Sequence, residues 1–284
     1  MSQILPSVPP ITIGADPELF LFNRRTKSYV SAHDLFPGTK YDPYVTAKGA
    51  IQVDGVSAEF NINPAAEVEE FINNISHTTS LMRRMISDPE LSLVAEPVAY
   101  FDREYFDSLP DEAKALGCSP DYNAWTGKVN PSPKTDEPFR TGSGHIHIGF
   151  TEDVDPYSPG HFHDCCEIVK QLDAVLYIPS HIWDMDTKRR SLYGQKGAFR
   201  PKTYGCEYRV LSNKWVADPD IAEWVFNATS EAHTLLSIGQ KVYENEMFKK
   251  MSQAETITPT DVFQYMHVLN KFSIPSLPKE YYAQ

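Results

Sequence analysis

The feature that most constrains this chain is a strict alternation of polar and apolar side chains in the segment Gly-Ser-Gly-His-Ile-His-Ile-Gly at residues 142–149. Side chains of a β-strand point alternately to opposite faces, so His145 and His147 should share one face while Ile146 and Ile148 occupy the other. The glycines at the start of the segment predict a turn that opens directly into the strand. We therefore expect two imidazoles on a polar face that is backed by an apolar core.

Further short segments repeat this design with carboxylates and a guanidinium on the polar face. They are Asp16-Pro17-Glu18-Leu19-Phe20, Glu59-Phe60-Asn61-Ile62-Asn63 and Glu207-Tyr208-Arg209-Val210. A merely solvated face would favour Lys, Thr and Ser. The Asp, Glu, His and Arg side chains therefore predict a sheet with a functional surface.

The spacing of turns and helical segments favours an α+β fold with a mainly antiparallel sheet and helices on its apolar face. Asp54-Gly55 predicts a hairpin turn between strands at 51–54 and 56–62. A doubly wound parallel sheet would show βαβ alternation and a glycine-rich phosphate turn, and neither is present. Other expected elements are a hairpin over 11–32, a helix opening at Asn63-Pro64, a strand over 91–100, and helices over 158–177, from 218 to about 246, and after Thr258.

Residues 117–141 are rich in Pro, Gly, Asn and Asp, and they predict a long loop that forms either a lid or a surface excursion. The last residues, from Pro275 to Gln284, are expected to form a tail.

Composition and charge narrow the class of protein. The chain has 284 residues with 41% hydrophobic content and a formal net charge of −12, which fits a folded acidic protein. No Lys/Arg-rich block is present, so we expect neither stable nucleic-acid binding nor an anionic-membrane surface. The 4 cysteines form no CxxC pair. The start of the chain lacks the pattern of a signal peptide, and no segment approaches the ~20 apolar residues of a membrane span. A cytoplasmic location is expected.

The polar residues point to metal and phosphate chemistry. Carboxylate oxygens suit Mg²⁺, and an added imidazole is tolerated better by Mn²⁺. The candidate ligands for two adjacent metal positions are Asp16, Glu18, Glu59, His145 and Glu207. Guanidinium groups fork onto phosphate oxygens, and the candidate phosphate ligands are Arg189, Arg190, Arg200 and Arg209. Together these residues favour phosphoryl transfer from a nucleoside triphosphate.

Each pattern also has a plain structural explanation. The two histidines could be a structural pair, the Asp16 and Glu18 carboxylates a solvated strand edge, and Glu207 with Arg209 a cross-strand ion pair. The basic stretch 188–202 could be a solvated loop. The joint occurrence of these patterns favours the functional interpretation.

The motifs GADPELFLF, VDGVSAEFNINPA, GCSPDYNAW, RTGSGHIHIGF and RRSLYGQKGAFRPKTYGCEYRVLSN resemble those of the phage-encoded carboxylate–amine ligases, the type 2 amidoligases. The order of acidic, histidine and arginine motifs is also similar to that of glutamine synthetase and of glutamate–cysteine ligase. The resemblance spans roughly residues 12–230. It implies a single glutamine-synthetase-like ligase domain over 11–272, with the lid at 117–141, a tail at 273–284 and a sheet curved into a funnel.

The resemblance also implies an ATP- and Mg²⁺-dependent reaction, with Mn²⁺ as an alternative ion, in which a carboxylate is phosphorylated and an amine attacks the acyl phosphate. Asp16, His145 and Glu207 would hold one metal, and Glu18 and Glu59 a second. Arg189, Arg190, Arg200 and Arg209 would act on the transferred phosphoryl group, and the last set of candidates would meet nucleotide or substrate: His147, Asp54, Asp121, Asn123 and Arg140.

In two respects the sequence departs from the glutamine synthetase pattern. The carboxylate expected after Glu59 has no counterpart at the usual spacing, and no small domain precedes Ile11, so a ring assembly is not expected. Partners would be small-molecule or peptide carboxylates and amines, while the substrates and oligomeric state stay open. The alternatives are an amino or guanidino phosphotransferase, a metal-dependent hydrolase that uses both histidines, and a metal-binding structural or interaction protein.

Overall fold

The computed structural model describes residues 11–114, 121–131 and 137–283. The prediction that the chain does not begin with a signal peptide rests on residues 1–6, which lie outside these ranges. The strands are β1 Thr12–Ala15, β2 Glu18–Asn23, β3 Ser28–Val30, β4 Tyr44–Thr46, β5 Gly49–Asp54, β6 Ser57–Ile62, β7 Leu91–Val94, β8 Val98–Tyr100, β9 Tyr122–Asn123, β10 Lys128–Val129, β11 Phe139–Thr141, β12 Ile146–Gly149, β13 Ala198–Lys202 and β14 Gly205–Tyr208. The α-helices are α1 Val68–Met85, α2 Arg103–Ser108, α3 Asp111–Lys114, α4 Pro159–Leu172, α5 Thr187–Leu192, α6 Pro219–Ser237, α7 Glu246–Met251 and α8 Pro259–Leu269.

The strands form two larger antiparallel sheets. One has the order β1-β12-β14-β13-β9-β10, and the other runs β3-β2-β6-β5-β4 with β7 also paired to β2. β8 and β11 form a separate two-stranded sheet. Every pairing between these strands is antiparallel. The expected α+β class with a mainly antiparallel sheet is confirmed, and the sheet is divided in two.

The division falls at Asp16-Pro17, where the chain passes from β1 in the first sheet to β2 in the second. Proline has no backbone N–H to donate to a strand neighbour and limits the backbone to a narrow range of φ. The backbone N–H of Asp16 still donates to the carbonyl of His145, and that of Glu18 donates to the carbonyl of Ser143. The two sheets are therefore joined along the segment that precedes β12.

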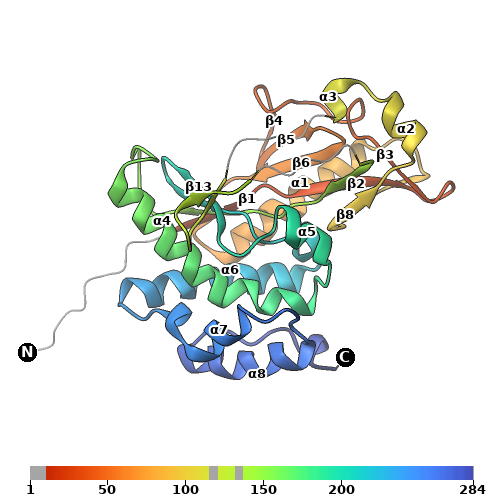
Figure 1. The fold of residues 1–284 in the computed structure, drawn as a ribbon. Helices are drawn as coiled ribbons and strands as arrows, with labels where there is room; N and C mark the ends of the chain where they lie inside the picture. Colours follow the sequence, from red (N-terminus) through yellow and green to blue (C-terminus); the bar gives the residue numbers. More distant parts are fainter. Residues whose placement is uncertain (1–10, 115–120, 132–136, 284) are drawn as a thin grey trace, which may run out of the picture.

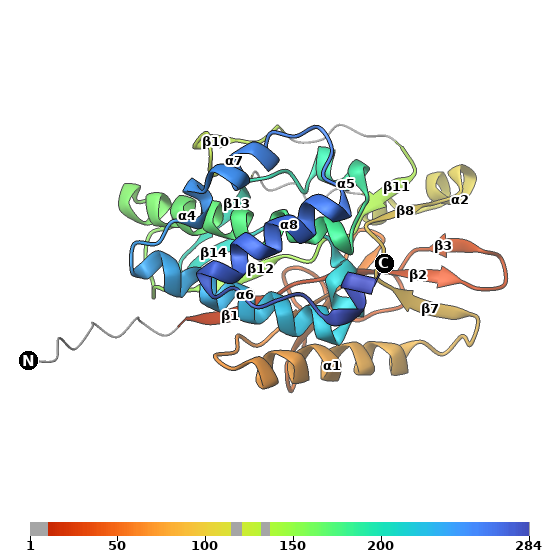
Figure 2. The same cartoon turned by 90° about the horizontal axis from the view of Figure 1, so that it is seen from below.

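The longer helices cover one side of the strands, whereas the short α2 and α3 lie at the other end of the molecule, near β3 (Figure 1). α4 packs on β13 and β14, α1 packs on β5 and β6, and α6 fills the space between α1 and α4. Figure 2, seen from the helical side, shows α1 and α6 running beside one another and α8 covering the layer from outside. The apolar strand positions Ile146 and Ile148 are fully buried beneath these helices. Their polar neighbours are left on the opposite face.

Helix boundaries differ from the sequence-based expectations in two places. The first helix begins at Val68 and not at Asn63-Pro64, because the backbone of Ala65 exchanges two hydrogen bonds with Ile13 and holds this segment extended. The long helix that opens at Pro219 ends at Ser237 and not near residue 246. Gly239 follows with a φ of +80°, a left-handed conformation that glycine adopts without strain.

Other segments are more structured than expected. The strand expected over 91–100 is divided into β7 and β8, and the described parts of the 117–141 segment contain β9, β10 and β11. Its residues 117–120 and 132–136 lie outside the described ranges. The expected tail packs on α6: the indole of Trp224 donates to the carbonyl of Pro275, and Leu277 is buried. Among the described residues, no helix combines the length and apolar character that crossing a membrane requires.

Candidate active site

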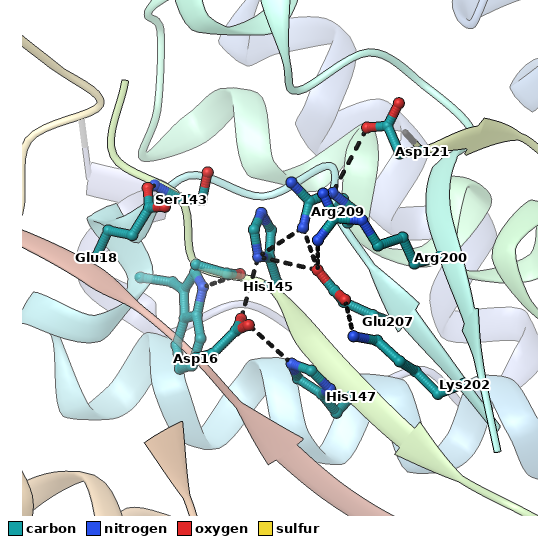
Figure 3. Close-up of polar contacts among 12 residues, drawn as sticks. Asp16, Glu18, Asp121, Ser143, His145, His147, Arg200, Lys202, Glu207 and Arg209 are labelled. Carbon is teal, nitrogen blue, oxygen red and sulfur yellow. Dashed lines mark hydrogen bonds and ion pairs between the residues drawn. The ribbon is translucent and has the colours of Figure 1, made fainter. Parts of the chain in front are cut away.

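The first group of side chains at the sheet junction consists of Asp16, His145 and Glu207 (Figure 3). The Nδ1 atom of His145 lies 3.1 Å from Oδ1 of Asp16 and 3.4 Å from Oε1 of Glu207. One ligand atom from each of the three residues can be chosen so that all lie within 4.8 Å of one another. We call these three residues cluster A. Their separation suits one shared divalent cation.

Strand register explains why these residues meet although they are far apart in the sequence. β1 pairs with β12 so that Ala15 opposes Ile146, and Asp16 continues this register opposite His145. β12 pairs with β14 so that His147 opposes Glu207. The period-two alternation then places all the polar side chains on the face away from the helices. Both histidines do face Asp16, as the alternation predicts, since Nε2 of His147 lies 3.1 Å from Oδ2 of Asp16.

The second group, cluster B, consists of the carboxylates Glu18, Asp54 and Glu59, whose oxygens also lie within 4.8 Å of one another. Glu18 opposes Glu59 in the β2–β6 pair, and the β5–β6 hairpin returns Asp54 to the same face. Asp54, a candidate substrate residue from the sequence, lines the cavity and is the third carboxylate of this group. Cluster B thus has three carboxylates, although the third one precedes Glu59 in the sequence.

Burial and mutual repulsion make the charges of cluster B costly. Burial, together with the charge of Asp54, raises the pKa of Glu18 to about 7. Burial and the charges of Asp16 and Glu18 raise the pKa of Glu59 well above its usual value, and burial likewise raises that of Asp54. Like charges packed together disfavour ionisation. A cation between them would relieve this repulsion.

The electrostatics of cluster A are the opposite, because cations surround its carboxylates. Burial would raise the pKa of Glu207, but Arg209 and His145 hold it well below the usual range. Burial also opposes the ionisation of Asp16, yet the two neighbouring histidines lower its pKa. Burial and the charge of Arg209 lower the pKa of His145 to about 4, so its ring stays neutral, which is the form that ligates metals.

Cationic side chains converge on Glu207 from two strands. Nζ of Lys202 lies 2.7 Å from its Oε2, Nη1 of Arg200 lies 3.6 Å from its Oε1, and Arg209 bonds the same Oε1. Arg209 also lies 3.5 Å from the carboxylate of Asp121. The expected arginines Arg200 and Arg209 are therefore within the site.

His147 connects cluster A to a tyrosine on the β13–β14 turn. Its Nδ1 atom shares a hydrogen bond with the hydroxyl of Tyr204, and its Nε2 faces Asp16. Burial lowers the pKa of His147, but the charge of Asp16 outweighs this effect and the pKa is raised overall. The Asp16 carboxylate therefore favours the protonated form of the His147 ring.

Some of the arginines expected at the site are located elsewhere. Arg189 is fully buried, and its guanidinium donates to the carbonyl of Val210, to the hydroxyl of Ser143 and to the carbonyl of Arg209. Arg190 donates to Ser180 and to the carbonyl of Asp184. Neither lines the cavity. The expectation that they contact phosphate is therefore replaced by a structural role for each, because their donors are used within the fold.

Of the residues expected to contact substrate, some line the cavity and others do not. Arg140 lines the cavity, although its guanidinium also donates to backbone carbonyls and lies over the ring of Phe106. Asn123 does not line it, because its side chain shapes the β9–β10 turn by accepting from the backbone of Trp125 and donating to the carbonyl of Lys196. Asp121 is not among the cavity-lining residues, and its carboxylate pairs with Arg209, which is.

Both clusters line one cavity of about 570 Å³. Sequence reasoning did not include several of its lining residues in the site: Lys40, Gln52, Ser143, Tyr193, Lys202 and Tyr204. Lys202 could have been found, because it follows Arg200 by two residues and so shares its strand face. Lys40 and Tyr193 lie in irregular segments, where no periodicity indicates the direction of a side chain.

Comparison with known proteins gives one family and distant structural likenesses. Residues 136–255 match the family described as phage phiEco32-like COOH.NH2 ligase-type 2. No curated protein sequence matches the chain. A crystal structure described as a novel glutamine synthase homolog is similar with a TM-score of 0.45 and 11% identity, covering 93% of this chain and 62% of that one. A bifunctional glutathione synthetase from Pasteurella multocida gives a TM-score of 0.46 and 10% identity, covering 96% of this chain and 46% of its own.

This chain thus spans less than two thirds of the length of either solved structure. The family match covers β12 to β14 and carries His145, Arg200 and Glu207, whereas Asp16 and cluster B precede it. Residues 136–255 are therefore similar to the type 2 COOH.NH2 ligases, the family that the motifs of this chain resemble.

Proposed function

We propose that this chain is an ATP- and divalent-metal-dependent ligase that joins a carboxylate to an amine through an acyl phosphate. The observation that carries the proposal is the convergence of cluster A, cluster B and the cations Arg200, Lys202 and Arg209 on one cavity. Two groups of anionic ligands beside three cations suit a metal-bound polyphosphate better than either a simple hydrolase or a scaffold. A family of carboxylate–amine ligases supports the same reaction class.

The residues fit divalent cations. Cluster A offers two carboxylates and a neutral imidazole, a set that accepts Mg²⁺ and suits Mn²⁺ well, and cluster B offers oxygen ligands alone. Oε2 of Glu207 is buried and accepts no hydrogen bond of good geometry. A buried polar atom without such a bond is costly, and a cation at cluster A would satisfy it.

The reaction would proceed by two displacements. A carboxylate oxygen of the substrate attacks the γ-phosphorus of ATP, and the bond from that phosphorus to ADP breaks. The amine nitrogen then attacks the acyl carbon, inorganic phosphate leaves, and the nitrogen loses a proton to give the amide. When bound, divalent metals would supply charge neutralisation on the phosphate oxygens.

The protein residues would mainly position and neutralise the reacting groups. Arg200 and Arg209 are largely buried, at 19% and 12% side-chain exposure, so their charges act in a medium that screens them less than water does. Asp121 lies 3.5 Å from Nε of Arg209 and would help to orient its guanidinium. Small-molecule or peptide carboxylates and amines are the substrates that a cavity of this size would accept.

The test is calorimetric titration of ATP with and without Mg²⁺, followed by trapping of an acyl phosphate with hydroxylamine. Glu207→Ala and His145→Ala should lose Mg²⁺-dependent binding and ATP turnover and keep a wild-type circular dichroism spectrum. His163→Ala, an exposed histidine on α4, is the matched control and should behave like the wild type.

Retained turnover in both variants would reject cluster A as the metal position. A product heavier by one phosphate, in place of a condensation product lighter by one water than its two parts, would identify a phosphotransferase.

A further inference from the structure

Within this site Glu207 has an unusual environment, because its carboxylate is 1% exposed and already neutralised from within the chain. Arg209 and Arg200 both approach Oε1, whereas Lys202 approaches Oε2, at 2.7 Å (Figure 3). The carboxylate proposed as a metal ligand therefore carries an ammonium group at one of its oxygens. A metal and this ammonium would compete for the same atom.

Lys202 differs from the two arginines in how firmly it is held. Its side chain is 31% exposed, compared with 19% for Arg200 and 12% for Arg209. It lies at the last position of β13, and its ammonium, although close to Oε2, makes no hydrogen bond of good geometry with it. A lysine is a point charge on a flexible four-carbon stem, so it can move away without disturbing the strand.

We propose that Lys202 is a tethered counter-cation, which holds Glu207 when no metal is bound and moves to the nucleotide phosphates when one is. The nucleotide half of this inference rests on the proposed function. The metal half rests only on the geometry of Glu207 and cluster A.

The physical consequence is cooperative binding. A divalent cation beside Oε2 would repel an ammonium group that stays within about 3 Å of the same atom. Metal alone must therefore displace Lys202 from Glu207, the carboxylate with which its ammonium forms an ion pair. Polyphosphate supplies a replacement anion, so metal and nucleotide should each raise the affinity for the other by the same factor.

The test compares Mn²⁺ binding to Lys202→Gln and to the unsubstituted protein by calorimetry, both in a Glu59→Gln background that weakens cluster B. Removal of the ammonium should tighten Mn²⁺ binding without nucleotide by roughly tenfold, a factor that corresponds to about 1.4 kcal/mol. The same substitution should weaken binding of a non-hydrolysable ATP analogue measured with Mn²⁺ present. Simple damage to the site would weaken both Mn²⁺ binding and nucleotide binding, whereas the proposal requires tighter Mn²⁺ binding and weaker nucleotide binding.

Lys214→Gln is the matched control. Lys214 has a similar side-chain exposure of 34% and a similar ion pair, 2.9 Å from Glu96, but it does not line the cavity. It should leave both affinities unchanged. Lys202→Met, which keeps the apolar stem, repeats the test if the glutamine variant folds poorly.

Unchanged or weaker Mn²⁺ binding in the Lys202 variants would overturn the proposal, as would the same gain in Lys214→Gln. Tighter Mn²⁺ binding with no nucleotide binding in any protein would reject the proposed ligase function while keeping Lys202 as a counter-cation.

Discussion

Replacing Glu18 by glutamine should stabilise the metal-free protein at alkaline pH and reduce the stabilisation that added metal provides. Glu18 is crowded by the carboxylates of cluster B, and burial raises its pKa from an ordinary 4.5 to about 7. Glutamine keeps an oxygen that can accept the backbone hydrogen bond which Glu18 accepts from Ser143, at 2.8 Å. The substitution therefore removes mainly the charge.

The magnitude follows from linkage. A group whose pKa is higher in the folded than in the unfolded state contributes stability below its unfolded pKa, and this contribution is lost as pH rises through the folded pKa. The interval from 4.5 to about 7, at about 1.4 kcal/mol per pKa unit, gives roughly 3.5 kcal/mol as an upper bound. Because Glu18 is only partly buried and the site can relax, we expect the gain of Glu18→Gln over wild type to grow by about 1–3 kcal/mol between pH 5 and pH 8.

The assay is urea unfolding at pH 5 and pH 8 in a chelating buffer, repeated at pH 8 with Mn²⁺. Saturating Mn²⁺ should stabilise the wild type, by about 2.7 kcal/mol at a hundredfold excess over Kd, and should stabilise the variant less. Glu255→Gln, at an exposed position, is the control and should change neither curve. Equal effects of Glu18→Gln at both pH values would refute the electrostatic argument, and equal stabilisation of both proteins by Mn²⁺ would refute Glu18 as a ligand.

Two further predictions concern buried charges outside the cavity. Arg189→Met should destabilise the fold by about 2–4 kcal/mol in urea unfolding, because the carbonyl of Val210 loses its buried donor; a wild-type unfolding midpoint would contradict the structural role of Arg189. Burial raises the pKa of Asp173 to about 7, although hydrogen bonds from Trp125 and Tyr208 lower it in part. The stability that the protonated carboxyl contributes is therefore lost as pH rises from about 4 to about 7. Asp173→Asn should therefore gain stability relative to wild type from pH 5 to pH 8, and a difference that does not vary with pH would argue against this account.

Much of the site follows from the sequence alone, because strand periodicity is a local property. Alternation in the segment 145–148 fixes which side chains share a face, and the carboxylates Asp16, Glu59 and Glu207 lie in segments of the same kind. An apolar back must be buried in any folded state, so the polar face is determined before any tertiary contact forms. The α+β class follows for the same reason, from hairpin turns and helical periodicity.

Other features depend on contacts between distant segments. Arg189 and Arg200 have the same chemistry in one basic stretch, and only the burial of Arg189 against the end of β14 separates a structural arginine from one in the cavity. Asp54 joins Glu18 because of a strand register that its own segment does not specify.

The helix boundaries and the packing of the C-terminal segment also depend on contacts between distant segments. The backbone of Ala65 pairs with Ile13 across the chain and delays a helix that local signals would start earlier. Likewise, Leu277 is buried in a segment that Trp224 of α6 binds through the carbonyl of Pro275. The sequence by itself determined the chemical character of each face, since that depends on neighbours two residues apart. The tertiary structure alone decided which of these groups share a cavity, because that depends on pairings between segments that are distant in the sequence, such as Asp16 with His145 and His147 with Glu207.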